Sequence, residues 1–297
     1  MTITITQIRA FLAVKNVGSV HGAATQLLVS QPSVSAAVAS LGRELGAVLF
    51  ERHGRGVRLT ESGEAFAPYA AEVLGLLEQG RSAAQEAAYP QASKVRLAAV
   101  NTAGEYLVPP LIQAYRQVDP GISILLEVGN RTTVFERLQS RHADIGIGGR
   151  PRGGLAGYPL VGNELVVVGR NVRADLASTP WLLREEGSGT RLATERLLAD
   201  LDFGSSESRS PELLTLGSNG AIKQGLVFGL GVTLISRYAV AAELRSGLLG
   251  EIGVPGTPLS RPWHVLYPQS RVTRPGVRAF AEFLRSPRAR QIIENLL

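Results

Sequence analysis

The sequence contains no cysteine among its 297 residues, so disulfide bonds, thiolate metal sites and cysteine nucleophiles are excluded. Its four histidines are scattered, at His21, His53, His142 and His264. None has metal-ligand spacing with another histidine or an acidic residue. No Gly-x-Ser-x-Gly nucleophile elbow occurs, and the Gly-Leu-Gly run at 229–231 is typical of a helix end and turn rather than of a dinucleotide site. We therefore expect a protein that is not an enzyme and that has no cofactor or metal.

Long hydrophobic runs are also missing, although 44% of the residues are hydrophobic. No run approaches the roughly 20 apolar residues that a membrane-spanning helix needs. The first residues, 1–5, lack the basic flank and apolar core of a signal peptide. We expect a cytoplasmic protein with no membrane partner, whose length allows two or three domains.

Two short helices joined by a tight turn are predicted near the N-terminus, over about residues 20–39. Ser19 is a suitable N-cap for a first helix that ends near Leu28, and Pro32 is preorganised for the first turn of the second helix. Apolar residues recur along the second helix from Val34 onward, so its polar N-terminal residues face outward. Gln and Ser side chains there match the donors and acceptors of base edges in the major groove.

Basic residues dominate the segment that follows. The whole chain has a formal net charge of +6, and residues 1–60 contain six basic and two acidic residues, a net charge of +4. Arginines are interspersed with glycines over 52–58, which indicates a two-stranded hairpin that holds phosphates. A single such arginine is more simply a solvated surface charge, but the helices before it favour phosphate contact. The candidate DNA-contacting residues are Ser30, Gln31, Pro32, Ser33, Ser35, Arg52, Arg55 and Arg58.

A long helix is predicted from residue 61 to about residue 88. Thr60 is a hydroxyl cap, acidic residues follow at 61 and 64, and apolar residues recur every three or four positions beyond Phe66. This row of apolar residues is longer than the small N-terminal helix-turn-helix segment, called the head below, could cover. Pairing with a second copy of the chain is therefore favoured over packing on its own head. The helix ends at a short predicted hinge, residues 89–93.

From Lys94 onward, short apolar strands alternate with helices, a pattern that predicts parallel α/β sheets. The expected strands lie at 95–100, 122–128, 143–148, 165–168, 181–183, 213–216 and 232–235, and the expected helices at 107–118, 133–141, 190–198 and 219–228.

The whole chain resembles the LysR-type transcriptional regulators. The resemblance implies an α/β fold with an N-terminal winged helix-turn-helix at 3–60, a linker and dimerisation helix at 61–89, and an effector-binding domain at 94–297. That domain would be two-lobed and similar to periplasmic binding proteins, with lobe I formed by 94–161 and 269–297 and lobe II by 162–268. Family members form homodimers or homotetramers. The head departs from the family pattern at His21-Gly22, Ala36-Ala37 and Gly42, which leaves the operator sequence open.

Four polar loops follow expected strands or open expected helices, where a ligand of an α/β lobe meets free backbone amides. Each loop alone is more simply a helix cap, but four around one cleft favour a binding site. The run Gly187-Ser188-Gly189-Thr190-Arg191 suits an anion, and it resembles the family branch that senses small oxyanions or phosphorylated metabolites. The candidate effector-binding residues are Asn101, Thr102, Ala103, Asn130, Thr132, Ser188, Gly189, Thr190, Arg191, Ser218, Asn219 and Lys223.

The sequence thus predicts a transcriptional regulator that binds a double-stranded DNA operator and responds to a small effector, an anion such as a carboxylate or a phosphorylated metabolite. Two alternatives remain at this point: a solute-binding protein without a DNA role, and a DNA-binding protein whose second domain has no ligand. The patterns do not distinguish activation from repression.

Overall fold

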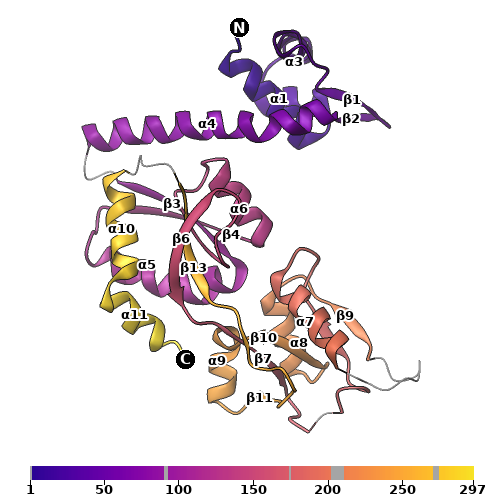
Figure 1. Cartoon of the computed structure of the whole chain (residues 1–297), viewed down its shortest axis with the longest axis vertical. Coiled ribbons are helices and arrows are strands. Elements are labelled where there is room, and N and C mark those ends of the chain that lie inside the picture. Colours follow the sequence, from indigo (N-terminus) through magenta and orange to yellow (C-terminus); the bar gives the residue numbers. More distant parts are fainter. Residues whose placement is uncertain (1, 90–92, 174, 202–210, 270–273) are drawn as a thin grey trace. The chain divides into compact units, whose positions relative to one another are not determined.

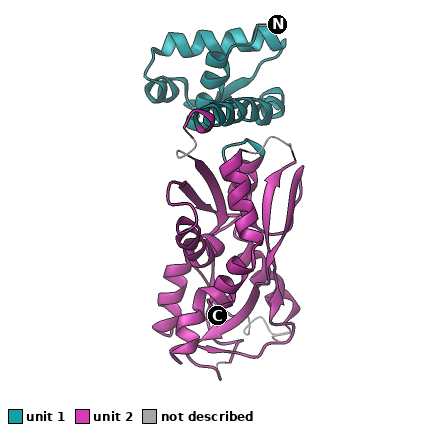
Figure 2. Cartoon of the chain, turned by 90° about the vertical axis from the view of Figure 1, so that its left-hand side faces the viewer, with its two compact units in different colours: residues 1–85, 139–142 teal, residues 86–138, 143–297 magenta. Residues whose placement is uncertain are grey.

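The computed structural model describes residues 2–89, 93–173, 175–201, 211–269 and 274–297 (Figure 1). The chain divides into two compact units, residues 1–85 with 139–142 and residues 86–138 with 143–297 (Figure 2). Residues 90–92 of the predicted hinge lie outside the described residues. Within the described ranges, no helix has the length and apolar character needed to cross a membrane.

The first unit begins with three helices and a hairpin, of which the second and third helices and the hairpin were predicted and the first helix was not. The elements are α1 (Ile5–Val17), α2 (Val20–Leu27), α3 (Gln31–Leu45), β1 (Phe50–His53), β2 (Gly56–Leu59) and α4 (Glu61–Ala88). The side chains of Thr4, Ser19 and Ser30 each accept a hydrogen bond from a backbone N–H in the first turn of α1, α2 and α3. These caps satisfy amides that have no partner within the helix, so they define where each helix starts.

Aromatic side chains hold this unit together. The Phe11 ring of α1 is fully buried, and its centroid lies 5.3 Å from those of Phe50 in β1 and Phe66 in α4. Ala67 and Ala70, also in α4, belong to the same apolar cluster. The N-terminal part of α4 therefore packs on the head, which was the alternative that the sequence disfavoured for the helix as a whole.

The hairpin is attached to the helices by its second strand. Val57 donates its backbone N–H to the carbonyl of Gly18, in the turn between α1 and α2, at 2.9 Å. A Cβ at position 56 would lie 2.5 Å from that carbonyl oxygen, so only glycine permits this approach. The hairpin is thus a wing fixed beside the helix-turn-helix.

In the second unit, one sheet has the strand order β4-β3-β5-β13-β6 and forms lobe I. Its strands are β3 (Lys94–Val100), β4 (Ser123–Gly129), β5 (Ile145–Gly148), β6 (Leu155–Val161) and β13 (Trp263–Pro268). Its helices are η2, a π-helical turn (Ala103–Leu107), α5 (Val108–Arg116), α6 (Arg131–Gln139), α10 (Pro275–Arg285) and α11 (Pro287–Glu294).

A second sheet has the order β11-β7-β10-β8-β9, with β12 also paired to β7, and forms lobe II. Its strands are β7 (Glu164–Gly169), β8 (Trp181–Leu183), β9 (Leu213–Thr215), β10 (Val232–Ser236), β11 (Gly250–Glu251) and β12 (Leu259–Ser260). The accompanying helices are α7 (Gly189–Asp200), α8 (Asn219–Val227) and α9 (Arg237–Arg245).

Two sequence-based expectations need correction here. The sheets are mixed rather than parallel, because β13 runs antiparallel to both β5 and β6, and β10 runs antiparallel to β7. Strand β13, which was assigned to lobe II, lies in the lobe I sheet, so the second crossover between lobes occurs near residues 261–262 instead of 269. An apolar strand has the same sequence pattern in either lobe, and its pairing partners are not encoded in that pattern.

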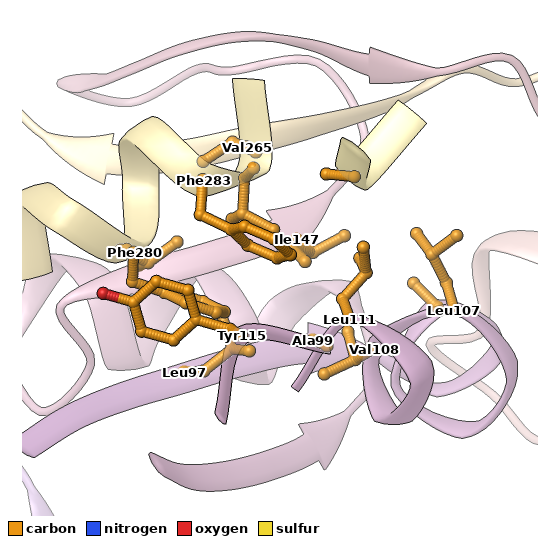
Figure 3. Close-up of a cluster of buried hydrophobic side chains, with 14 of the residues drawn as sticks. Leu97, Ala99, Leu107, Val108, Leu111, Tyr115, Ile147, Val265, Phe280 and Phe283 are labelled. Atoms are coloured by element: carbon orange, nitrogen blue, oxygen red, sulfur yellow. The ribbon is translucent and has the colours of Figure 1, made fainter. Parts of the chain in front are cut away.

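The core of lobe I lies between its central strands and the helices α5 and α10 (Figure 3). The ring of Tyr115 in α5 lies 5.0 Å from Phe280 and 5.1 Å from Phe283, both in α10. Leu97 and Ile147, in adjacent strands β3 and β5, are no more than 1% exposed. The C-terminal helices therefore complete the lobe that begins at Lys94, and the core joins the two ends of the unit.

Candidate functional sites

The start of α3 presents polar side chains to solvent. Gln31, Ser33 and Ser35 are exposed, whereas Val34 between them is 1% exposed and belongs to the core. Ser30 Oγ accepts the backbone N–H of Ser33 at 3.3 Å and lies 2.7 Å from the Ser33 hydroxyl. The cap therefore also orients the Ser33 side chain. This is the arrangement that a recognition helix needs in order to place its N-terminal residues at base edges.

The wing carries exposed arginines in two different settings. Arg58 donates from Nε to Glu51 on the neighbouring strand at 2.6 Å, and the two side chains are 63% and 47% exposed. Arg52 and Arg55 are also exposed, and in the described part of the chain neither forms an ion pair. The wing thus offers two uncompensated cations to a polyanion and a third cation that is already paired.

A cavity of about 360 Å³ opens between the two lobes of the second unit. Its lobe I side is formed by the carboxyl ends of β3, β4 and β5, and its lobe II side by the loop before α7 and the crossover near residue 261. The polar and charged side chains that line it are Asn101, Thr102, Asn130, Arg131, Arg150, Asn163, Arg184, Ser188, Thr190, Ser260 and Arg261.

Six of the sequence-predicted effector residues line this cavity: Asn101, Thr102, Asn130, Ser188, Gly189 and Thr190. Two of them cap helices whose N-termini border it. Asn130 Oδ1 accepts from the backbone N–H of Thr133 in α6 at 2.9 Å, and Ser188 Oγ accepts from that of Arg191 in α7 at 3.4 Å. Both helix N-termini therefore add positive potential at the cavity.

The other six predicted residues make different contacts. Ala103 is fully buried, and Thr132 follows the cavity residue Arg131 in α6. Arg191 donates to Glu195 at 2.7 Å, and Ser218 caps α8 by accepting from the backbone N–H of Ala221. Lys223 pairs with Glu243 at 2.8 Å, and its Nζ lies 5.2 Å from the Tyr106 ring centroid.

Asn219 joins the lobes rather than facing the cavity. Its side chain is buried, and Nδ2 donates to Glu105 at 2.9 Å and to Thr102 at 3.3 Å, both in lobe I. Its Oδ1 accepts from Arg184 Nη1 in lobe II. Because Thr102 and Arg184 line the cavity, Asn219 connects two of the side chains that a ligand would touch.

Sequence reasoning missed the arginines of the cavity, Arg131, Arg150, Arg184 and Arg261. Three of them follow β4, β5 and β8, so the same rule that selected Asn101 and Asn130 would have found them. The rule was applied to loops rich in small polar residues and glycines, and it selected the cations Arg191 and Lys223 but not these. Arg261 lies in a crossover between lobes, and no local pattern in the sequence indicates its position.

Arg131 has unfavourable electrostatic surroundings. Burial lowers the pKa of its guanidinium, and the nearby charges of Arg152 and Arg261 lower that pKa further. Among the described residues, its Nε is a buried donor without an acceptor. Arg131 is also the first residue of α6, where the helix dipole disfavours a cation.

Negative charge at the cavity is scarce. No Asp or Glu is among the described residues that line it. Arg184 is neutralised by Glu185, to which its Nε and Nη2 donate at 2.7 and 2.9 Å. Arg131, Arg150 and Arg261 form no ion pair with a carboxylate in the described ranges. The cavity therefore holds about three positive charges that the protein itself does not balance.

A winged helix-turn-helix with exposed cations, followed by two α/β lobes around a cavity, defines a DNA-binding regulator with a sensor domain. Two family models match the chain: a bacterial regulatory helix-turn-helix protein of the lysR family over residues 5–64, and the LysR substrate binding domain over residues 90–288. The chain belongs to the LysR family and is a DNA-binding transcriptional regulator.

Its relatives are transcriptional regulators rather than enzymes. The chain is 31% identical to the HTH-type transcriptional activator CmpR of Synechocystis, over 95% of this chain and 94% of that one. It is 32% identical to the RuBisCO operon transcriptional regulator of Acidithiobacillus ferrooxidans, over 95% and 93%. Among solved structures, the Synechocystis CcmR regulatory domain in complex with 2-PG is 29% identical, covers 65% of this chain and 95% of its own, and has a TM-score of 0.56.

Proposed function

We propose that this regulator responds to a small anion with more than one negative charge, bound in the cavity between the lobes. The observation that carries the proposal is Arg131, a half-buried cation whose buried Nε has no partner among the described residues, with two arginine neighbours and a helix N-terminus behind it. An anion would supply the missing acceptor and the missing charge together. The cytoplasm, where the operator DNA lies, is the proposed place of action.

The cavity offers two kinds of contact to such an anion. Thr102, Ser188 and Thr190 supply hydroxyls, and the α7 N-terminus supplies backbone amides. Arg131, Arg150 and Arg261 supply charge. The relative CcmR was solved with 2-PG, and 2-phosphoglycolate, with a phosphate and a carboxylate, is the kind of ligand that could use both sets of contacts. A neutral sugar or a polyamine would leave the cations uncompensated.

The proposed DNA site is the exposed start of α3 with Ser30, Gln31, Pro32, Ser33 and Ser35, together with the wing residues Arg52, Arg55 and Arg58. The proposed domain division is 3–60, 61–89 and 94–297, with β13 moved to lobe I as its pairing requires.

The experiment is a thermal-shift and calorimetric screen of the full chain with inorganic phosphate, sulfate, glycolate and 2-phosphoglycolate. We expect 2-phosphoglycolate to bind more tightly than glycolate or phosphate, since only it carries both anionic groups. Arg131→Gln should weaken its binding about 10- to 100-fold, because a hydrogen bond to a charged group contributes about 1.5–3 kcal/mol.

The matched control is Arg191→Gln, which makes the same substitution in the first turn of α7, at a side chain that pairs with Glu195 and does not line the cavity. It should leave anion affinity within about twofold. A verified effector that is neutral or cationic, or equal losses from the two substitutions, would refute the assignment of the cavity.

A further inference from the structure

A chain of buried side chains of alternating charge joins the last turn of α4 to the central strands of lobe I. Glu86 in α4 is 5% exposed, and Arg274 before α10 and Asp144 before β5 are each 7% exposed. Arg96 in β3 completes the chain. All four residues belong to the same compact unit. The two acidic and two basic side chains balance one another, so this group of residues does not require a ligand.

Glu86 is the member that belongs to the linker helix. Its Oε1 accepts from Ser93 Oγ at 2.8 Å and from the backbone N–H of Gly276 at 2.7 Å, and its Oε2 accepts from Arg274 Nη1 at 3.3 Å. Gly276 lies in the first turn of α10, where a carboxylate is favoured by the helix dipole. A Cβ at position 276 would lie 2.6 Å from Ser93 Oγ, so this contact also depends on glycine.

Arg274 connects Glu86 to the strands of lobe I. Its Nη2 donates to Asp144 Oδ2 at 2.7 Å, and its Nη1 donates to the carbonyl of Lys94 at 2.7 Å. Asp144 in turn accepts from the backbone N–H of Arg96 at 2.8 Å and from Arg96 Nη2 at 3.0 Å. The planar guanidinium of Arg274 thus reaches three acceptors, which a lysine could not do.

We propose that this Glu86–Arg274–Asp144 chain is the joint that fixes the last turn of the linker helix on lobe I, and that Arg274 is its positioning residue. Residues 89–93 were predicted to be a short hinge, and a hinge that acted alone would absorb a rearrangement of the lobes. A buried carboxylate without its cationic partner is strongly destabilised, so the last helical turn must follow lobe I. The joint acts in the regulatory function and does not depend on which effector the cavity binds.

The first test needs no ligand. Hydrogen–deuterium exchange is measured on full-length wild type, Glu86→Gln and Arg274→Lys. We expect the backbone amides of residues 84–89 to exchange at least tenfold faster in both variants, with β3 and β5 unchanged. Glu78→Gln is the matched control, since it makes the same substitution in the same helix at a side chain that is 45% exposed. It should leave residues 84–89 protected.

The second test measures coupling. DNA affinity is determined by fluorescence anisotropy with and without 2-phosphoglycolate, and the affinity of each variant for 2-phosphoglycolate is determined by calorimetry. We expect Glu86→Gln and Arg274→Lys to retain anion affinity within about twofold and to lose at least four-fifths of the effect of the anion on DNA affinity. A residue that only stabilises the fold would not separate these two quantities.

The proposal is overturned if residues 84–89 stay protected in both variants, if exchange rises equally throughout the lobe, or if coupling persists despite local exchange. If 2-phosphoglycolate does not bind wild type, the proposed effector class fails, and the exchange measurement alone decides whether the joint exists.

Discussion

Glu51 and Arg55 affect the wing in opposite directions. Glu51 neutralises Arg58 across the hairpin, whereas Arg55 at the turn is uncompensated by any described carboxylate. Glu51→Gln should strengthen binding to all DNA sequences and steepen the salt dependence, because it frees a cation. Arg55→Gln should weaken binding and reduce the slope of log K against log salt by about one unit. Anisotropy titrations at several salt concentrations check both, and slopes that move in the same direction would contradict the assignment.

We propose that Gln31 and Ser33, which are exposed beside the buried Val34, recognise bases. Gln31→Ala should reduce the preference for a selected operator over random DNA by about 1–3 kcal/mol, the contribution of one good base contact. Binding to random DNA should hardly change, since phosphate contacts remain. Equal losses on the two DNAs would remove Gln31 from the recognition surface.

The individual residues that could be predicted from sequence are those with a local signal, such as a helix cap or a position just after a strand. Ser19 was predicted as a cap and is one, and Thr102, Asn130 and Ser188 follow strands or open helices. The importance of Arg131 was not predictable, because it comes from burial and from Arg152 and Arg261, which are distant in sequence. Charge balance in a cavity is a property of the tertiary structure.

Among the elements, those with strong periodicity were predicted well. The predicted 61–88 helix is confirmed as α4, and α2, α3 and the wing are where their caps and glycines place them. The π-helical turn before α5 was not predicted, because i to i+5 bonding has no distinct hydrophobic period. The lobe of β13 was assigned wrongly because strand pairing between distant segments is set by packing.

Helix α4 is also the element that we expect to form a dimer. Its inner residues Ala67 and Ala70 are covered by the head, but Val73 and Leu76 remain 39% and 46% exposed, and Tyr69 is 69% exposed. Val73→Asp and Leu76→Asp should produce monomers that bind DNA poorly, because each buries a charge in the proposed interface.

Light scattering at micromolar concentration checks the assembly. Gln85→Asp, at an exposed position on the opposite side of the same helix, should leave the dimer intact. A wild-type chain that stays monomeric would contradict the proposed pairing, and so would aspartate variants that remain dimeric.

For the whole molecule, sensing requires that anion binding and DNA binding be thermodynamically linked. A ligand shifts an equilibrium only through its different affinity for the two states, and linkage makes the effect reciprocal. If saturating 2-phosphoglycolate changes the affinity for a selected two-half-site operator by some factor, saturating operator must change the affinity for 2-phosphoglycolate by the same factor. Calorimetry and anisotropy on the same preparation measure the two factors, and Arg131→Gln should shift the anion concentration needed without changing the factor at saturation. A factor of one in both directions would mean that the cavity binds an anion without regulating DNA binding.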